Sequence, residues 1–119
     1  MSKKIKTVDL FCGCGGMSLG FQDAGFQITS AFDIWEPAVQ IYSKNFNHPI
    51  HKINLLDPIV IEMISKDSPD IIIGGPPCQD FSISGKRDFE GKRANLTIRF
   101  AEIVSILKPR WFVMENVYN

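Results

Sequence analysis

Cysteine is scarce in this 119-residue chain, which has three, two of them only two positions apart. A disulfide framework needs paired and spaced cysteines, so this count predicts a reducing, cytoplasmic environment. Long apolar runs are also missing, and runs such as residues 71–73 are far too short to span a bilayer. The N-terminal segment 1–6 contains three lysines and leads into a predicted strand, not into the apolar stretch of a signal peptide. We therefore expect neither a membrane-spanning nor a disulfide-stapled secreted protein.

An excess of one charge is missing as well, because 13 Lys and Arg balance 13 Asp and Glu. A net charge of zero argues against a chain that holds nucleic acid by overall electrostatic attraction alone. Metal-binding patterns are weak, since Cys12 and Cys14 have no second pair nearby and the chain has only two His. No metal site is predicted.

The chain does have the composition of a globular domain, with 45% hydrophobic and 22% charged residues, and its length suits a single domain over residues 1–119. Short β-rich runs alternate with longer helical runs. Strands are predicted at residues 5–11, 26–32, 51–55, 70–74 and 111–114. Helices are predicted at residues 17–24, from Pro37, from Pro58 with Asp57 as its cap, and along an apolar stripe at 96–107. This alternation predicts an α/β fold with a parallel, doubly wound sheet.

Glycines follow the first predicted strand and precede the first predicted helix. Gly13 and Gly15 allow a ligand to approach the backbone closely, and the helix start offers free amides to an anion such as a carboxylate. The spacing is not the dinucleotide fingerprint, because the third glycine is missing. A tight structural turn is the alternative interpretation.

The other predicted strands also end in chemically special residues, where such sheets place their sites. Asp33 is about twenty residues past the glycine loop and suits a ribose diol, with a helix cap as the alternative. Cys78 follows two prolines and suits a nucleophile, with a small core residue as the alternative. Glu115 follows the last strand and suits a proton-holding carboxyl beside Cys78, with a cap or surface charge as the alternative.

A basic segment follows Cys78. Residues 82–94 are predicted to be a loop, and from Ser82 to Arg99 five basic residues face two acidic ones. Such a loop beside a nucleophile can close over a phosphate backbone, and a solvated surface loop is the alternative.

Three motifs together resemble the cytosine-5 DNA methyltransferases. They are Asp-Leu-Phe-Cys-Gly-Cys-Gly-Gly at residues 9–16, Gly-Gly-Pro-Pro-Cys-Gln-Asp-Phe-Ser at 74–82, and Glu-Asn-Val at 115–117. Their order and spacing match the early motifs of that catalytic domain, and the resemblance covers essentially all 119 residues. It implies a Rossmann-like, S-adenosylmethionine-dependent methyltransferase fold with DNA as substrate.

The resemblance also implies roles toward S-adenosylmethionine as the methyl donor. The residues implied around its methionine part are Phe11, Cys12, Gly13 and Gly15. Asp33 would hold the ribose hydroxyls, Ile34 would pack on the adenine, and Pro76 with its neighbours would close the adenosine pocket. The sequence departs from the family at Lys52, where an acid usually reads the adenine amino group, so Asn54 or the Ile53 backbone would substitute. It also departs at Cys12, where Ala or Ser is more usual.

For catalysis the resemblance implies that Cys78 adds to carbon 6 of a flipped cytosine while Glu115 binds ring nitrogen 3. Arg93 matches a family arginine in the loop that closes over the base. The two later strands of the seven-stranded family sheet, the Gln-x-Arg-x-Arg motif, the late Asn-rich motif and the target-recognition domain are not in the sequence. We therefore expect about five strands, and a truncated chain, a gene fragment or one half of a split enzyme that needs a C-terminal polypeptide.

Three alternatives remain open at this point. One is a non-catalytic module that binds the donor or a partner chain. Another is a tRNA methyltransferase, since one branch of the family uses this fold on RNA. The third, a nicotinamide dehydrogenase, is disfavoured by the glycine spacing.

Overall fold

Five strands form one parallel sheet in the computed structural model, which describes residues 3–77 and 95–116. The strands are β1 (Lys6–Leu10), β2 (Gln27–Asp33), β3 (Ile50–Lys52), β4 (Ile71–Gly74) and β5 (Trp111–Met114). The helices are α1 (Gly16–Asp23), α2 (Glu36–Asn45), α3 (Ile59–Asp67) and α4 (Leu96–Leu107). The strand order is β3-β2-β1-β4-β5, and every neighbouring pair is parallel. This confirms the predicted α/β Rossmann-like class.

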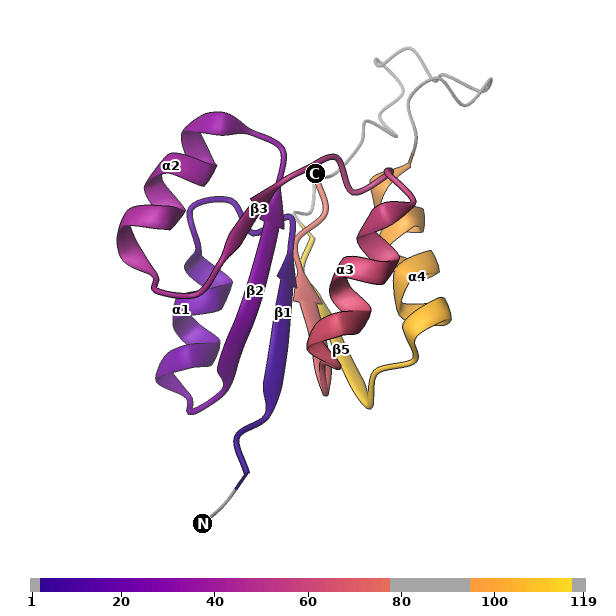
Figure 1. Ribbon diagram of the computed structural model, residues 1–119, viewed down its shortest axis with the longest axis horizontal. Helices are drawn as coiled ribbons and strands as arrows, with labels where there is room; N and C mark the ends of the chain where they lie inside the picture. Colours follow the sequence, from indigo (N-terminus) through magenta and orange to yellow (C-terminus); the bar gives the residue numbers. More distant parts are fainter. Residues whose placement is uncertain (1–2, 78–94, 117–119) are drawn as a thin grey trace.

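The helices cover both faces of the sheet (Figure 1). Helices α1 and α2 lie together on one face, and α3 and α4 lie on the other. The chain adds β2 and β3 on one side of β1 and then returns to add β4 and β5 on its other side. The order of strand addition therefore reverses between β1 and β4, and the crevice beyond such a reversal is where ligands bind in doubly wound sheets.

The main core lies where the sheet packs against α3 and α4. Its buried members are Val8, Leu10, Phe32, Leu55, Val60, Ile64, Ile72, Phe100 and Ile103. All four residues of β4 are buried, as its unbroken apolar sequence predicts for a strand covered on both faces. On the other face, Cys12, Ala31 and Tyr42 form a smaller buried cluster.

The third strand ends earlier than the predicted range 51–55. After Lys52, the Ile53 amide still donates to the Asp33 carbonyl at 3.0 Å, but the next residues turn away from the sheet. The Asp57 amide then donates to the Asn54 carbonyl at 2.9 Å, which forms the turn before α3. Helix α3 begins at Ile59, one residue later than predicted, with Pro58 at its N-cap position. Asp57 still binds the start of the helix, because the Ile59 amide donates to its Oδ1 atom at 3.0 Å.

Candidate functional site

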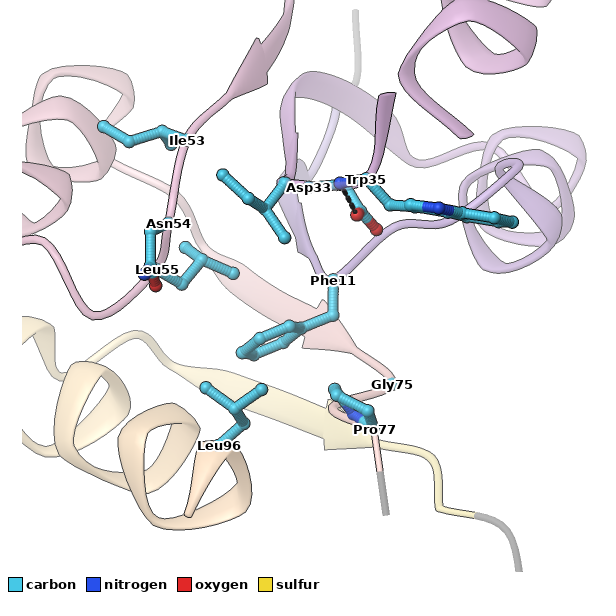
Figure 2. Close-up of a pocket in the computed structure, with 10 residues that line it drawn as sticks. Phe11, Asp33, Trp35, Ile53, Asn54, Leu55, Gly75, Pro77 and Leu96 are labelled. Atoms are coloured by element: carbon cyan, nitrogen blue, oxygen red, sulfur yellow. Dashed lines mark hydrogen bonds between the residues drawn. The ribbon is translucent and has the colours of Figure 1, made fainter. Parts of the chain in front are cut away.

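A cavity of about 310 Å³ opens beyond the carboxyl ends of β1, β2 and β4 (Figure 2). Its lining residues are Phe11, Asp33, Ile34, Trp35, Ile53, Asn54, Leu55, Gly75, Pro77 and Leu96. Most are apolar, and Asp33 and Asn54 supply the polar side chains, which is the usual composition of a small-molecule site. The cavity therefore lies where the topology predicts a ligand.

Phe11 supplies an aromatic wall of this cavity. Its backbone is in the left-handed region, with φ at 56°, which non-glycine residues seldom adopt. Figure 2 shows the ring extending across the pocket toward Leu96. An uncommon conformation held at the end of β1 thus directs an aromatic face into the cavity, and such conformations are concentrated at functional sites.

Asp33 connects the glycine loop to the end of β2. Its Oδ2 atom accepts a hydrogen bond from the Gly13 amide at 2.8 Å, and its Oδ1 atom accepts one from the Trp35 amide at 2.9 Å. Helix α2 begins after Trp35, and that N-cap residue makes no side-chain capping bond. Asp33 therefore orders the loop ahead of the helix, and each carboxylate oxygen keeps a lone pair for a ligand hydroxyl.

Lys52, the residue that departs from the family pattern, does not line the cavity. Its Nζ atom lies 2.7 Å from Glu36 Oε2, and this hydrogen bond lowers the pKa of the Glu36 carboxyl. Asn54 does line the cavity, and its Oδ1 atom is occupied by the Leu56 amide at 2.9 Å. Asn54 can therefore offer a ligand its amide NH2 as a donor, while Oδ1 already accepts one backbone bond.

Three other residues that were predicted around the methyl donor do not line the cavity, namely Cys12, Gly13 and Gly15. Gly15 is buried with φ at 103°, and a Cβ added there would lie 2.4 Å from a ring carbon of Phe46 and 3.0 Å from one of Tyr42. Gly15 is thus required for packing against α2. Cys12 packs with Ala31 and Tyr42, and burial raises the pKa of its thiol, which keeps it protonated.

Pro76 is buried, and its neighbour Pro77 reaches the cavity. Cys78 and Arg93 lie outside the described residues. Glu115 directly follows β5, and its amide donates to the Gly74 carbonyl at 2.9 Å. Its carboxylate lies over Gly75, where an added Cβ would be 3.1 Å from Glu115 Oε2. The Glu115 carboxylate therefore lies beside Gly75, a cavity residue that is three positions before Cys78 in the chain.

Of the five basic residues counted in the segment after Cys78, Arg99 lies within the described residues, and it does not face outward to a phosphate. Its side chain is only 12% exposed, and its Nε atom donates to the Leu55 carbonyl at 2.7 Å. The guanidinium is turned inward to a wall of the cavity and is not available to a phosphate.

A chain of buried polar groups was not foreseen from the sequence. Ser18 Oγ donates to Asp9 Oδ2 at 2.5 Å and lies 2.8 Å from the Tyr42 hydroxyl, which in turn bonds to His48 Nε2. Asp9 is fully buried, and its Oδ1 atom has no hydrogen-bond partner among the described residues. Burial raises the pKa of Asp9 to about 7, and the Ser18 hydroxyl partly counteracts it. Only the presence of an acid within an apolar strand could have signalled this arrangement.

Three cavity residues were also not predicted, namely Trp35, Leu55 and Leu96, whereas Gly75 and Pro77 are the neighbours that were expected with Pro76. Each adjoins a predicted motif or the first turn of a predicted helix, so adjacency was the only available signal. Within residues 3–77 and 95–116 no three His, Cys, Asp or Glu side chains come together as a metal site would require. In the same ranges no helix has the length and apolar character needed to cross a membrane.

Comparison with known proteins identifies relatives of this chain. Residues 5–119 match the family model described as C-5 cytosine-specific DNA methylase. The Type II methyltransferase M.HindV of Haemophilus influenzae is 59% identical over 114 residues, which are 95% of this chain and 38% of that protein.

Solved structures show the same relationship. A DNA modification methyltransferase encoded within an E. coli prophage aligns with a TM-score of 0.77 and 34% identity, over 96% of this chain and 32% of that one. Spodoptera frugiperda DNMT2 aligns with a TM-score of 0.76 and 30% identity, over 98% of this chain and 36% of that one. The chain thus spans less than two fifths of the length of each of these proteins.

Proposed function

Because this chain belongs to the C-5 cytosine-specific DNA methylase family, we propose that it forms the donor-binding and nucleophile-bearing part of a DNA cytosine-5 methyltransferase. Residues 1–119 would be the N-terminal part of the catalytic domain. The observation that carries the proposal is the cavity at the reversal of strand order, next to which the Glu115 carboxylate lies.

The residues of the cavity fit S-adenosylmethionine as the methyl donor. The apolar side chains of Phe11, Ile34 and Ile53 suit the faces of an adenine ring. Asp33 has acceptor capacity left for the two ribose hydroxyls, and the Asn54 amide can donate to a ring nitrogen. When bound, the donor supplies an electrophilic methyl group on a positively charged sulfur.

The proposed chemistry uses Cys78 and Glu115 on a cytosine that is flipped out of the duplex. The Cys78 thiolate forms a bond to carbon 6 and pushes electron density to carbon 5. Glu115 donates a hydrogen bond or a proton to ring nitrogen 3, where negative charge would otherwise build up. Carbon 5 takes the methyl group from sulfur, and loss of the carbon 5 proton then re-forms the double bond and expels Cys78. Arg93 would contact the DNA from the segment after Cys78.

A C-terminal polypeptide is proposed as the partner that completes the enzyme. The supporting observations are the share of the relatives' length that the chain spans and the exposure of all four residues of β5. The proposed substrate implies action in the cytoplasm, in agreement with the low cysteine count.

The decisive experiment uses a chimera in which residues 1–119 replace the matching region of the 59% identical Haemophilus relative. The chimera should transfer labelled methyl groups to cytosine in DNA and form a covalent adduct on DNA that contains 5-fluorocytosine. Cys78→Ser should abolish the adduct, whereas Cys14→Ser and Cys12→Ser should retain it. An adduct that survives in Cys78→Ser would overturn the assignment of the nucleophile.

Two other functions have some support. The DNMT2 structure aligns almost as well as the prophage methyltransferase, so this part of the chain does not separate DNA from RNA substrates. Methyl transfer to DNA and to tRNA by the chain joined to its own C-terminal remainder distinguishes these two. A non-catalytic donor-binding module would instead bind S-adenosylhomocysteine but transfer no methyl group, whether it is tested in the chimera or joined to another C-terminal polypeptide.

A further inference from the structure

The wall of the cavity between β3 and α3 is held in part by a side chain from another element. Ile53, Asn54 and Leu55 line the cavity from this segment, which leaves the sheet after β3. Its turn is closed by the bond from the Asp57 amide to the Asn54 carbonyl. The Leu55 carbonyl accepts a side-chain donor from elsewhere in the fold, and Leu55 itself is only 3% exposed. The Asp57 carbonyl accepts the Val60 amide at 3.2 Å and also a longer bond from that same outside side chain. The position of this wall therefore depends on a residue outside it.

That residue is Arg99 of α4. Its Nε atom lies 2.7 Å from the Leu55 carbonyl oxygen, and its Nη2 atom lies 3.4 Å from that of Asp57. The nearest carboxylate, Glu102, is 3.8 Å away and half-exposed, so it is the weaker partner. A planar guanidinium can reach two carbonyls at once, whereas a lysine ammonium cannot reproduce this fork.

Helix α4 also lines the cavity directly. Its first residue, Leu96, lines the cavity, and Arg99 follows one turn later on the same side of the helix. The Asn95 side chain fixes this end of the helix, because its Oδ1 atom accepts bonds from the Thr97 and Ile98 amides at 3.0 and 3.2 Å. The first turn of α4 thus supplies one side chain to the cavity directly and holds the opposite segment through Arg99.

We propose that Arg99 is a positioning residue for donor binding, which acts by holding the segment of Ile53, Asn54 and Leu55 at the cavity. The proposal rests on the proposed function, since it names how this chain shapes the donor site. Arg99 touches neither donor nor DNA in this role. Its loss should weaken donor binding and leave the chemical step and DNA binding largely unchanged.

The test is steady-state kinetics of the Haemophilus chimera with Arg99→Met, which keeps much of the aliphatic stem but removes both donors. We expect the KM for S-adenosylmethionine to rise about tenfold, because a small displacement of binding groups has large effects. The KM for DNA and kcat should change less than threefold, and the Kd of S-adenosylhomocysteine by calorimetry should rise in parallel with the donor KM. Arg99→Lys should fall between wild type and Arg99→Met, and it carries the comparison if Arg99→Met does not fold.

Two matched variants separate this role from general stability. Glu102→Gln removes the weak ion pair and keeps the carbonyl bonds, so its donor KM should match wild type. Ile103→Val trims a buried residue of the same helix, so it should lower the melting temperature without changing the donor KM. A donor KM for the Arg99 variants that equals wild type, or that rises no more than in an equally destabilised Ile103→Val, overturns the inference alone. A wild-type chimera that binds no S-adenosylhomocysteine overturns the proposed function together with the inference.

Discussion

At the scale of single residues, ionisation of the buried Asp9 carboxyl opposes folding at neutral pH. Its carboxyl is fully buried, and its pKa rises from an ordinary value of 3.8 to about 7, chiefly because burial disfavours the charged form. The folded protein therefore binds more protons than the unfolded chain between these two values. Stability from this group is greatest below pH 4 and falls as the pH rises to 7.

We predict that Asp9→Asn becomes more stable relative to wild type as the pH rises from 4.5 to 7.5. The two pKa values differ by about three, which sets an upper limit of roughly 4 kcal/mol on this change. Urea unfolding of both chimeras across the range measures it. The pKa of His48 is lowered by burial, which gives a slope of opposite sign, but His48 is present in both proteins and its contribution largely cancels.

Ser18→Ala provides the complementary arm of that experiment. The Ser18 hydroxyl lowers the pKa of Asp9 by donating to it, so its removal should extend the fall in stability to higher pH. A stability difference between Asp9→Asn and wild type that is the same at every pH would show that Asp9 does not titrate in this way.

Asp33 is the second residue whose charge can be tested. Asp33→Ala removes the acceptor proposed for the ribose hydroxyls, so the affinity for S-adenosylhomocysteine should fall by about 1.5–3 kcal/mol, the range for a hydrogen bond to a charged group. Calorimetry on the chimera measures this change. Asp57→Ala is the matched control, since that carboxylate also accepts a backbone amide bond but lies outside the cavity lining. Unchanged affinity with a lower melting temperature would show that Asp33 acts through its bonds to Gly13 and Trp35 and does not bind the ribose.

At the scale of elements, two glycines of the first helix region should respond to alanine in opposite ways. Gly15→Ala places a Cβ 2.4 Å from the Phe46 ring at a φ of 103°, so it should destabilise the protein by more than about 2 kcal/mol. Gly20→Ala lies within α1, where an added Cβ meets nothing within 4 Å, so it should stabilise by about 0.5–1 kcal/mol. Thermal unfolding of the two chimeras compares them directly. Equal effects would mean that the contact between the loop and α2 does not constrain Gly15.

The elements themselves were largely predictable because their signals are local. Apolar runs and glycine, proline and aspartate positions predicted all five strands and four helices, since strand burial and capping depend on neighbouring residues. The end of β3 was not predictable, because Ile53-Asn54-Leu55 keeps the alternating pattern of a strand but turns away from the sheet toward α3. Asp33, Ile34, Phe11 and Ile53 were predicted around one ligand and do line one cavity.

The side-chain contacts that shape the site could not be predicted in the same way. Arg99 bonds to a carbonyl 44 positions earlier, and Ser18 lies 24 positions from Tyr42. Such pairs depend on how helices dock on the sheet, which no local pattern encodes. Arg99 was counted with the basic segment that follows Cys78, because charge alone does not reveal whether a side chain turns inward.

At the scale of the whole molecule, the sheet has one edge that is poorly protected. Within the described residues β5 pairs only with β4, and its four side chains are between 39% and 67% exposed. Ile98 and Ile106 of α4 are also more than half exposed. Parallel strands are normally covered on both faces, and an uncovered edge offers unpaired backbone groups to other chains.

We therefore predict that residues 1–119 alone do not methylate DNA and that they self-associate in solution. Sedimentation should show oligomers or aggregates for the isolated chain, and a monodisperse species for the chimera, in which C-terminal residues can cover β5. Trp111→Lys, at the most exposed position of the strand, should reduce the association of the isolated chain, because a charge on an edge strand opposes pairing with another copy. A monodisperse wild-type monomer would contradict the argument from the edge but not the proposed chemistry. Incorporation of labelled methyl groups into DNA by that monomer would contradict the need for a C-terminal partner, because it would show that the donor cavity and Cys78 are sufficient for the reaction.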